Sequence, residues 1–287
     1  MDRRRLGIVA LILLAGCGPS PRTVTIDGSS TVFPIANILA EDFAESHPDV
    51  RVVANKSGTG GGLQKLARGE IDVATASRPV EPREARAVRG GVVAIPIADD
   101  GITVIVNPAN PLVSMTSEGL RAAWSGRVDD WGAFGAPLGR IGFYGPTESH
   151  GTYEIFTEAV DGRVGRVRRD VQTDEDYNVV VRAVADDPRG MGYVGYDYYL
   201  RNCDRVKALA VDGVLPTERT IGSGAYRPLA RPLYLVVARR SLTRPEVRGF
   251  LDFALGARGR AAVAEARYVP LPQGELEATR RRVAAAG

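Results

Sequence analysis

Cysteine and histidine are scarce in this chain of 287 residues, which contains two of each. No paired cysteines and no His-x-x-x-His spacing occur, which argues against a zinc hydrolase. Lysine is also rare, and the many arginines are scattered rather than gathered in a basic block or an aromatic–basic stripe. Nucleic acid is therefore not an expected partner.

Two common enzyme motifs are missing as well. The chain has no Gly-x-Ser-x-Gly elbow and no Walker A sequence. A serine or cysteine nucleophile would find no obvious base other than His150. We expect a protein that is not an enzyme, holds no metal and needs no cofactor.

The N-terminal apolar run, Leu6 to Leu14, is too short to cross a bilayer as a stable helix. It follows three arginines, which is the pattern of a secretory signal peptide over residues 1–16. The run ends in Leu14-Ala15-Gly16-Cys17, which resembles the lipobox of bacterial lipoproteins and implies a diacylglycerol on the sulfur of Cys17. Residues 17–22 then form a tether, and Cys203 is the one cysteine left to the folded part. We expect an extracytoplasmic protein, lipid-anchored to the cell-envelope membrane.

Strand-like and helix-like runs alternate along the rest of the chain, which is long enough for two domains. Thr23–Ile26 and Arg51–Ala54 are extended, and apolar residues from Ile35 to Phe43 recur at helical spacing. Separate strands are predicted near residues 92–97 and 101–106. This alternation predicts α/β layers with a largely parallel sheet, whose ligands bind beyond the carboxyl ends of the strands.

Three loops rich in glycine, serine and threonine each follow an extended run and open a helix-like run. They are Gly28-Ser29-Ser30-Thr31, residues 57–62 and residues 147–152. A helix N-terminus has unsatisfied N–H groups and a partial positive charge, and glycine lets the backbone approach a ligand closely. Three such loops predict an oxyanion that is held from several sides.

Three ionisable side chains could complete an oxyanion site, and each has an ordinary alternative. Arg78 offers a fork of donors, or makes a surface ion pair. An ionised Asp100 could accept a hydrogen bond from a protonated oxyanion and would repel sulfate, or Asp99 and Asp100 are turn residues. His150 could donate to an anion when protonated, or faces solvent in its loop.

These residues resemble the PstS family, the substrate-binding proteins of bacterial phosphate ABC importers. The resemblance covers nearly the whole mature chain and depends on the order and spacing of short motifs. They are Gly28-Ser29-Ser30-Thr31-Val32-Phe33-Pro34, Ser57-Gly58-Thr59-Gly60-Gly61, residues 71–79, Asp100-Gly101-Ile102-Thr103-Val104, Tyr144-Gly145-Pro146, Gly151-Thr152-Tyr153 and residues 191–196. His150 stands where the family usually has serine, and Arg78 stands where some members have aspartate.

The resemblance implies an α/β, two-lobed periplasmic binding protein fold (type II) with the ligand cleft between the lobes. Lobe 1 would comprise residues 23–104 and 231–287, and lobe 2, inserted between them, residues 105–230. Phosphate contacts carried over by position fall on Ser30, Thr31, Ser57 or Thr59, Ser77, Arg78, Gly151 and Thr152. Asp100 and His150 join this site by our reasoning from their chemistry.

The function that follows is a monomeric, lipid-anchored receptor that binds inorganic phosphate by lobe closure and delivers it to the permease subunits of an ABC transporter. Three alternatives stay open at this point. They are a receptor for another oxyanion, such as sulfate, molybdate or an organic phosphate, a signalling or adhesive surface protein on the same scaffold, and a hydrolase of phosphate esters.

Overall fold

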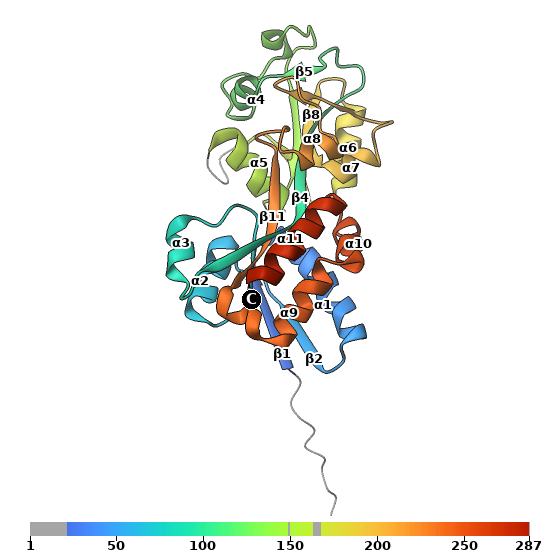
Figure 1. Cartoon of the computed structure of the whole chain (residues 1–287). Coiled ribbons are helices and arrows are strands. Elements are labelled where there is room, and N and C mark those ends of the chain that lie inside the picture. Colours follow the sequence, from blue (N-terminus) through green and yellow to red (C-terminus); the bar gives the residue numbers. More distant parts are fainter. Residues whose placement is uncertain (1–21, 149, 163–167, 287) are drawn as a thin grey trace, which may run out of the picture.

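The computed structural model describes residues 22–148, 150–162 and 168–286. The predicted signal peptide, Cys17 and nearly all of the predicted tether lie outside the described residues. Two lobes are joined by two long strands, β4 (Val92–Val106) and β11 (Ala230–Ala238), which run from one lobe into the other (Figure 1). Within the described part of the chain, no helix combines the length and the apolar character needed to cross a membrane.

Lobe 1 is built from both ends of the described chain. Its N-terminal elements are β1 (Arg22–Gly28), α1 (Phe33–Ser46), β2 (Val50–Ala54), α2 (Thr59–Arg68), β3 (Val73–Ala76) and α3 (Pro82–Ala87). Its C-terminal elements are η2 (Arg239–Thr243), α9 (Pro245–Ala254), α10 (Ala257–Glu265), β12 (Val269–Pro270) and α11 (Gln273–Ala286).

Lobe 2 contains the elements between the two crossover strands. They are β5 (Ser114–Met115), α4 (Ser117–Trp124), η1 (Trp131–Phe134), β6 (Gly142–Pro146), α5 (Gly151–Asp161), β7 (Gln172–Asp174), α6 (Tyr177–Asp186), β8 (Gly190–Gly195), α7 (Tyr196–Leu200), β9 (Lys207–Ala208), β10 (Ala210–Val211) and α8 (Glu218–Gly222).

One continuous path of strands crosses both lobes, in the order β2-β1-β3-β11-β4-β8-β6-β7. Strands β1, β2 and β3 are parallel in lobe 1, and β6, β7 and β8 are parallel in lobe 2. The crossover strands are antiparallel to their neighbours in each lobe, so the prediction of a largely parallel sheet is right for β1–β3 and β6–β8 and wrong for β4 and β11.

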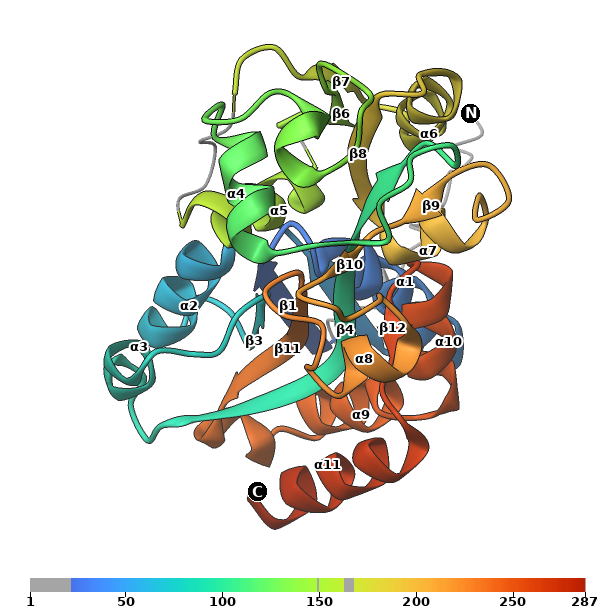
Figure 2. The same cartoon turned by 90° about the horizontal axis from the view of Figure 1, so that it is seen from above.

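Each lobe packs helices on both faces of its strands. In lobe 1, α1 and α9 cover one face and α2 and α3 the other (Figure 2). In lobe 2, α4 and α5 lie on one face and α6 on the other. The fully buried Trp124 makes edge contacts with Phe143, Phe156 and Tyr193, which form the centre of this second core.

The crossover strand β4 corrects two expectations. The strands predicted separately at 92–97 and 101–106 are one strand, because Asp99, Asp100 and Gly101 pair with Pro232, Arg231 and Ala230 of β11. The alternative interpretation of Asp99 and Asp100 as turn residues is therefore wrong. Along β4, residues up to Ala98 pack into the hydrophobic core of lobe 1, and residues from Ile102 onward pack into that of lobe 2. The lobe boundary predicted between residues 104 and 105 therefore falls inside β4, and it stays a proposal.

Loop residues 28–31 depend on a glycine at their first position. Gly28 has φ +144, and a Cβ there would lie 2.3 Å from the backbone oxygen of Thr75 on β3.

We therefore expect Gly28→Ala to lower the free energy of unfolding by about 2 kcal/mol or more, measured by urea unfolding. Gly58→Ala is the matched control. Gly58 also has a positive φ, +79, but a Cβ there would have nothing within 4 Å of it, so a loss of about 1 kcal/mol is expected. Equal losses in the two variants would contradict the steric account.

Candidate functional site

A pocket between the lobes contains six of the residues predicted from the sequence. Ser30, Thr31, Asp100, His150, Gly151 and Thr152 line this cavity of about 260 Å³. Tyr177 of α6 and Arg267, which follows α10, line it as well. The first and third of the predicted loops are thus brought together, one from each lobe.

The N-termini of α1 and α5 meet at this pocket. A Cβ on Gly151, the first residue of α5, would lie 2.5 Å from Thr31 Oγ1, so the two lobes approach closely here. Neither α1 nor α5 has a side-chain cap, whereas Thr116 and Asp176 cap α4 and α6. At α1 the Phe33 N–H already donates to Ser29 O and Pro34 has no N–H, so the N–H groups available to an anion are those of the loop before α1 and those at the start of α5.

The hydroxyl groups of Thr31 and Thr152 are held so that each can donate into the pocket. Arg231 Nη2 donates to Thr31 Oγ1 at 3.1 Å, and the Tyr177 hydroxyl donates to Thr152 Oγ1 at 2.7 Å. Burial raises the pKa of the Tyr177 phenol far above its usual value, so this phenol keeps its proton. A hydroxyl oxygen that already accepts still has its own proton to donate. The arrangement thus supplies one oriented O–H donor from each lobe.

Asp100 and Arg231 form a charged pair on the crossover strands behind these threonines. They are opposite each other in the β4–β11 register, with Arg231 Nε 3.9 Å from Asp100 Oδ2. Burial raises the pKa of the Asp100 carboxyl, and the Arg231 guanidinium opposes that rise. Burial also lowers the pKa of Arg231, and the carboxylate opposes this change. Arg231 Nε has no hydrogen-bond partner among the described residues, so the pair is not saturated by protein groups.

Sequence reasoning missed Arg231 and Tyr177. Arg231 begins the apolar run of β11, and an arginine at the start of a buried strand is a signal that could have marked it. Tyr177 is the first residue of α6 and gave no such signal, because its partner Thr152 lies in another element.

His150 is the N-cap residue of α5, and its ring bonds within lobe 2. Its Nε2 lies 3.0 Å from the backbone oxygen of Glu175, which can only accept, so Nε2 carries the proton. The second nitrogen then has an N–H to offer only when the ring is protonated. His150 lines the pocket, as predicted, and the T-shaped contact of its ring with Tyr177 fixes its position.

The structure does not bring Ser57, Thr59, Ser77 and Arg78 into this pocket. Arg78 makes a bidentate ion pair with Glu84, both bonds 2.8 Å, and a third of its side chain is exposed. Arg78 therefore makes an ion pair, which was the alternative to ligand binding, whereas Arg231 bonds Thr31, a residue that lines the pocket. Thr59 Oγ1 lies 3.4 Å from Ser77 Oγ, so these two hydroxyls meet each other.

The second loop, residues 57–62, supports the first loop instead of lining the pocket. The backbone N–H groups of Ser57 and Gly58 both donate to Gly28 O. A Cβ on Gly62 would lie 2.6 Å from Asp27 O, so α2 packs directly against the end of β1. Glycine in this loop thus permits close packing of two backbones, a role that the sequence pattern does not distinguish from ligand contact.

Asp99 points to the opposite face of β4 from Asp100, as adjacent residues in a strand do. It lines a separate cavity with Glu275 and Tyr234, and its side chain is buried, with no hydrogen-bond partner for Oδ2 among the described residues. Burial, aided by the charges of Glu275 and Asp100, raises the pKa of Asp99 to about 7. A carboxyl with a raised pKa binds a proton more tightly in the folded chain than in the unfolded chain.

Stability should therefore fall as pH rises from about 4 to about 7, because the unfolded chain releases the Asp99 proton first. We expect a loss of about 3 kcal/mol over this range, measured by urea unfolding at each pH. Asp99→Asn should reduce that slope, while Asp100 and Asp197, whose pKa values burial also raises, keep their part of it; Asp49→Asn, at an exposed carboxylate, should leave it. An unchanged slope in Asp99→Asn would show that Asp99 is not the group responsible.

Comparison with known proteins agrees with this geometry. Residues 16–258 match the family model described as a PBP superfamily domain. Protein SphX of Synechococcus elongatus is 36% identical, covering 90% of this chain and 80% of SphX. The phosphate-binding protein PstS of Staphylococcus saprophyticus is 35% identical, covering 93% of this chain and 88% of that protein.

Two solved structures are similar over nearly their whole length. A possible phosphate binding protein from Planctomyces limnophilus has a TM-score of 0.86 and 37% identity, covering 92% of this chain and 98% of that one. A substrate-binding protein assigned to phosphate ABC transport, from Clostridium perfringens and with bound phosphate, has a TM-score of 0.64 and 26% identity, covering 88% and 100%. These relatives are binding proteins and not enzymes, which confirms the non-enzymatic prediction. The chain belongs to the PBP superfamily and, within it, to the PstS family.

Proposed function

We propose that this protein is a receptor for inorganic phosphate, which it binds between the N-termini of α1 and α5. The observation that carries the proposal is the pair of oriented hydroxyls, Thr31 in lobe 1 and Thr152 in lobe 2. A tetrahedral anion between them accepts one O–H from each lobe and N–H groups from the loop before α1 and from the start of α5. The names and the bound phosphate of the relatives support the choice of anion.

The donor count is sufficient for useful affinity. Micromolar binding requires about −8 kcal/mol, and each hydrogen bond to a charged group contributes roughly 1.5–3 kcal/mol before ordering and desolvation costs. A few donors fall short after those costs, whereas about ten are sufficient. The hydroxyls of Ser30 and the two threonines, with the backbone N–H groups of the loop before α1 and of the start of α5, supply most of these donors.

Asp100 gives the site its selectivity in this proposal. An ionised carboxylate only accepts, so it bonds the hydroxyl of hydrogen phosphate and repels fully ionised sulfate. Arg231 opposes the rise that burial causes in the pKa of Asp100, and its guanidinium neutralises part of the negative charge. Arg231 thereby takes the role that sequence reasoning gave to Arg78.

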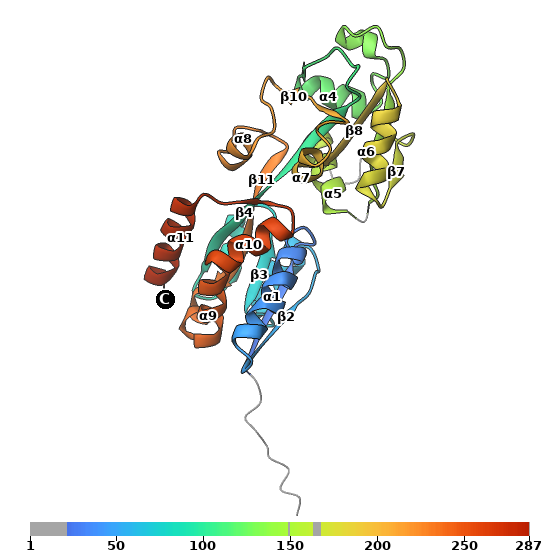
Figure 3. The same cartoon turned by 90° about the vertical axis from the view of Figure 1, so that its right-hand side faces the viewer.

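Binding closes the two lobes on the ligand by a hinge motion in β4 and β11. Figure 3 shows these strands as the connection between lobes that are otherwise separate layers of helix and strand. The lobes of this proposal are residues 23–104 with 231–287, and residues 105–230. Phosphate bound to Thr31 alone or Thr152 alone would have only half of its donors, so the closed form is the tight-binding form.

The receptor is proposed to be lipid-anchored at Cys17 after removal of residues 1–16, and to act as a monomer outside the cytoplasm. It then delivers phosphate to the permease subunits of an ABC importer. The lipobox-like residues 14–17 and the family of transport receptors support this arrangement.

Titration of the chain from residue 18 onward, stripped of bound anions, tests the proposal. Intrinsic tryptophan fluorescence is followed while phosphate or sulfate is added. We expect micromolar or tighter binding of phosphate and at least about 100-fold weaker binding of sulfate. Asp100→Asn should narrow this preference about tenfold or more, because an amide can donate to sulfate. A wild-type preference for sulfate, or unchanged selectivity in the variant, would contradict the role of Asp100.

Tyr177→Phe tests the orientation of the Thr152 hydroxyl. Without the phenol, Thr152 is free to turn its proton away from the ligand, so we expect phosphate affinity to fall about five- to tenfold. Tyr199→Phe, at another tyrosine of lobe 2 that does not line the pocket, is the control and should bind like the wild type. Calorimetric titration measures both, and equal affinities of the two variants would refute the orienting role.

A further inference from the structure

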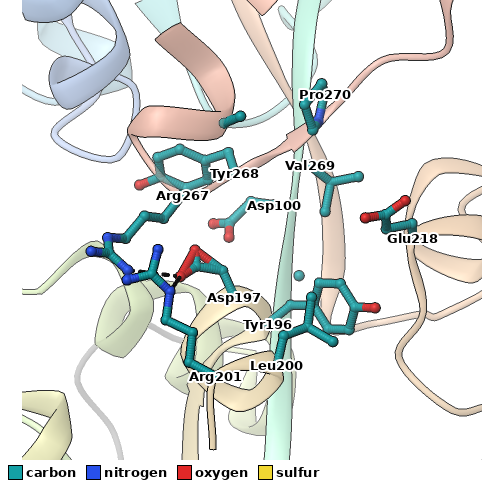
Figure 4. Close-up of a pocket in the computed structure, with 12 residues that line it drawn as sticks. Asp100, Tyr196, Asp197, Leu200, Arg201, Glu218, Arg267, Tyr268, Val269 and Pro270 are labelled. Carbon is teal, nitrogen blue, oxygen red and sulfur yellow. Dashed lines mark hydrogen bonds and ion pairs between the residues drawn. The ribbon is translucent and has the colours of Figure 1, made fainter. Parts of the chain in front are cut away.

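A second cavity of about 350 Å³ adjoins the ligand pocket, and Arg267 lies between the two. Both cavities are lined by Asp100, Asp197, Arg267 and Tyr268. Figure 4 shows the guanidinium groups of Arg267 and Arg201 converging on the carboxylate of Asp197. Arg267 Nη1 lies 3.2 Å from Asp197 Oδ2, and its guanidinium carbon lies 5.4 Å from the centre of the Tyr198 ring.

This ion pair joins the two lobes. Arg267 follows α10 in lobe 1, whereas Asp197 and Tyr198 belong to α7 in lobe 2. Arg201 also pairs with Asp197, at 3.3 Å, but it follows the same helix α7 and makes no link between lobes. The two arginines therefore share one carboxylate, and only one of the two contacts is broken when the lobes separate.

The backbone of Arg267 is in a conformation that favours glycine. Its φ is +69, and the N–H groups of Arg267 and Tyr268 bond to Ala264 O and Val263 O, which is the glycine-type end of a helix. Asp212 is the other non-glycine residue with positive φ in the described part of the chain, and its carboxylate accepts from Ser117. Backbone strain kept at a non-glycine residue points to a role for the side chain.

Asp197 needs a cation in this position. Its carboxylate is mostly buried, and Oδ1 has no hydrogen-bond partner within the described residues. Burial raises the pKa of Asp197, and the Arg267 guanidinium opposes the rise. Separation of the lobes would leave this carboxylate with Arg201 alone, so the pair favours the closed form.

We propose that Arg267 is an inter-lobe latch, which holds the closed form through Asp197 and so sets the affinity and residence time of the ligand. The inference depends on the proposed function only for the identity of the ligand, phosphate. The apparent dissociation constant of a receptor is its intrinsic constant divided by the fraction in the binding-competent form. A latch that raises the closed fraction therefore tightens binding and slows release without itself bonding the ligand.

Three variants test the latch. Arg267→Gly removes the side chain and relieves the strained backbone, Arg267→Lys keeps the charge, and Arg201→Ala removes the cation that lies within lobe 2. We measure small-angle X-ray scattering without ligand, the phosphate dissociation rate by stopped flow, and the thermal unfolding midpoint.

For Arg267→Gly we expect a larger radius of gyration, dissociation about tenfold faster and an unfolding midpoint equal to or above that of the wild type. Loss of a latch should weaken binding without lowering the unfolding midpoint, whereas loss of a merely structural residue should weaken binding and lower the midpoint together. Arg267→Lys and Arg201→Ala should stay within about twofold of the wild-type dissociation rate.

Several results would overturn the latch. They are wild-type scattering and dissociation in Arg267→Gly, a lower unfolding midpoint together with weaker binding in that variant, or an equal effect of Arg201→Ala. If the wild-type chain binds no phosphate, the proposed function fails. The ligand-free scattering of Arg267→Gly still tests the latch in that case, because it requires no ligand.

Discussion

The pairing of Asp100 with Arg231, across the two strands that join the lobes, is the constraint on which the site depends. Asp100 is buried and Arg231 mostly buried where the first core ends and the second begins. Two opposite charges can be kept there only if each remains partnered, and removal of one would leave the other unpaired in a poorly solvated place. Arg231 also bonds Thr31, so this pair connects the sheet and hinge to the first ligand-facing hydroxyl.

The pocket combines preorganisation with motion. Within each lobe, a partly buried donor fixes one threonine hydroxyl, and backbone N–H groups lie beside it, in the loop before α1 and at the start of α5. Each half is thus ordered before ligand arrives, which lowers the entropy lost on binding. What then changes on binding is the distance between the part of the site in lobe 1 and the part in lobe 2. Gly151 approaches Thr31 so closely that a larger side chain at residue 151 would hold the two lobes apart. Affinity in such a protein is governed by closure as much as by contacts.

Local sequence pattern predicted most of the elements and six of the residues that line the pocket, because it reports what each segment does on its own. The loops at Thr31 and Thr152 were identifiable as glycine- and hydroxyl-rich helix starts, and Asp100 as a carboxylate beside them. Long-range pairing was not accessible. The continuity of β4 through Asp99 and Asp100 depends on β11, far away in sequence. The sequence does not distinguish Arg78 from Arg231 as a candidate for the site. Only the structure shows that the Arg78 guanidinium is already paired with the Glu84 carboxylate.

A crystal structure of the described chain with bound phosphate would show directly which residues hold the anion. We expect one phosphate between the N-termini of α1 and α5, within hydrogen-bond distance of Thr31 Oγ1 and Thr152 Oγ1, with a phosphate oxygen against the Asp100 carboxylate. Phosphate bound instead by Arg78, Ser57 and Thr59, with neither threonine in contact, would contradict it. In that case the second loop would be the site, and the Asp100–Arg231 pair would be structural only.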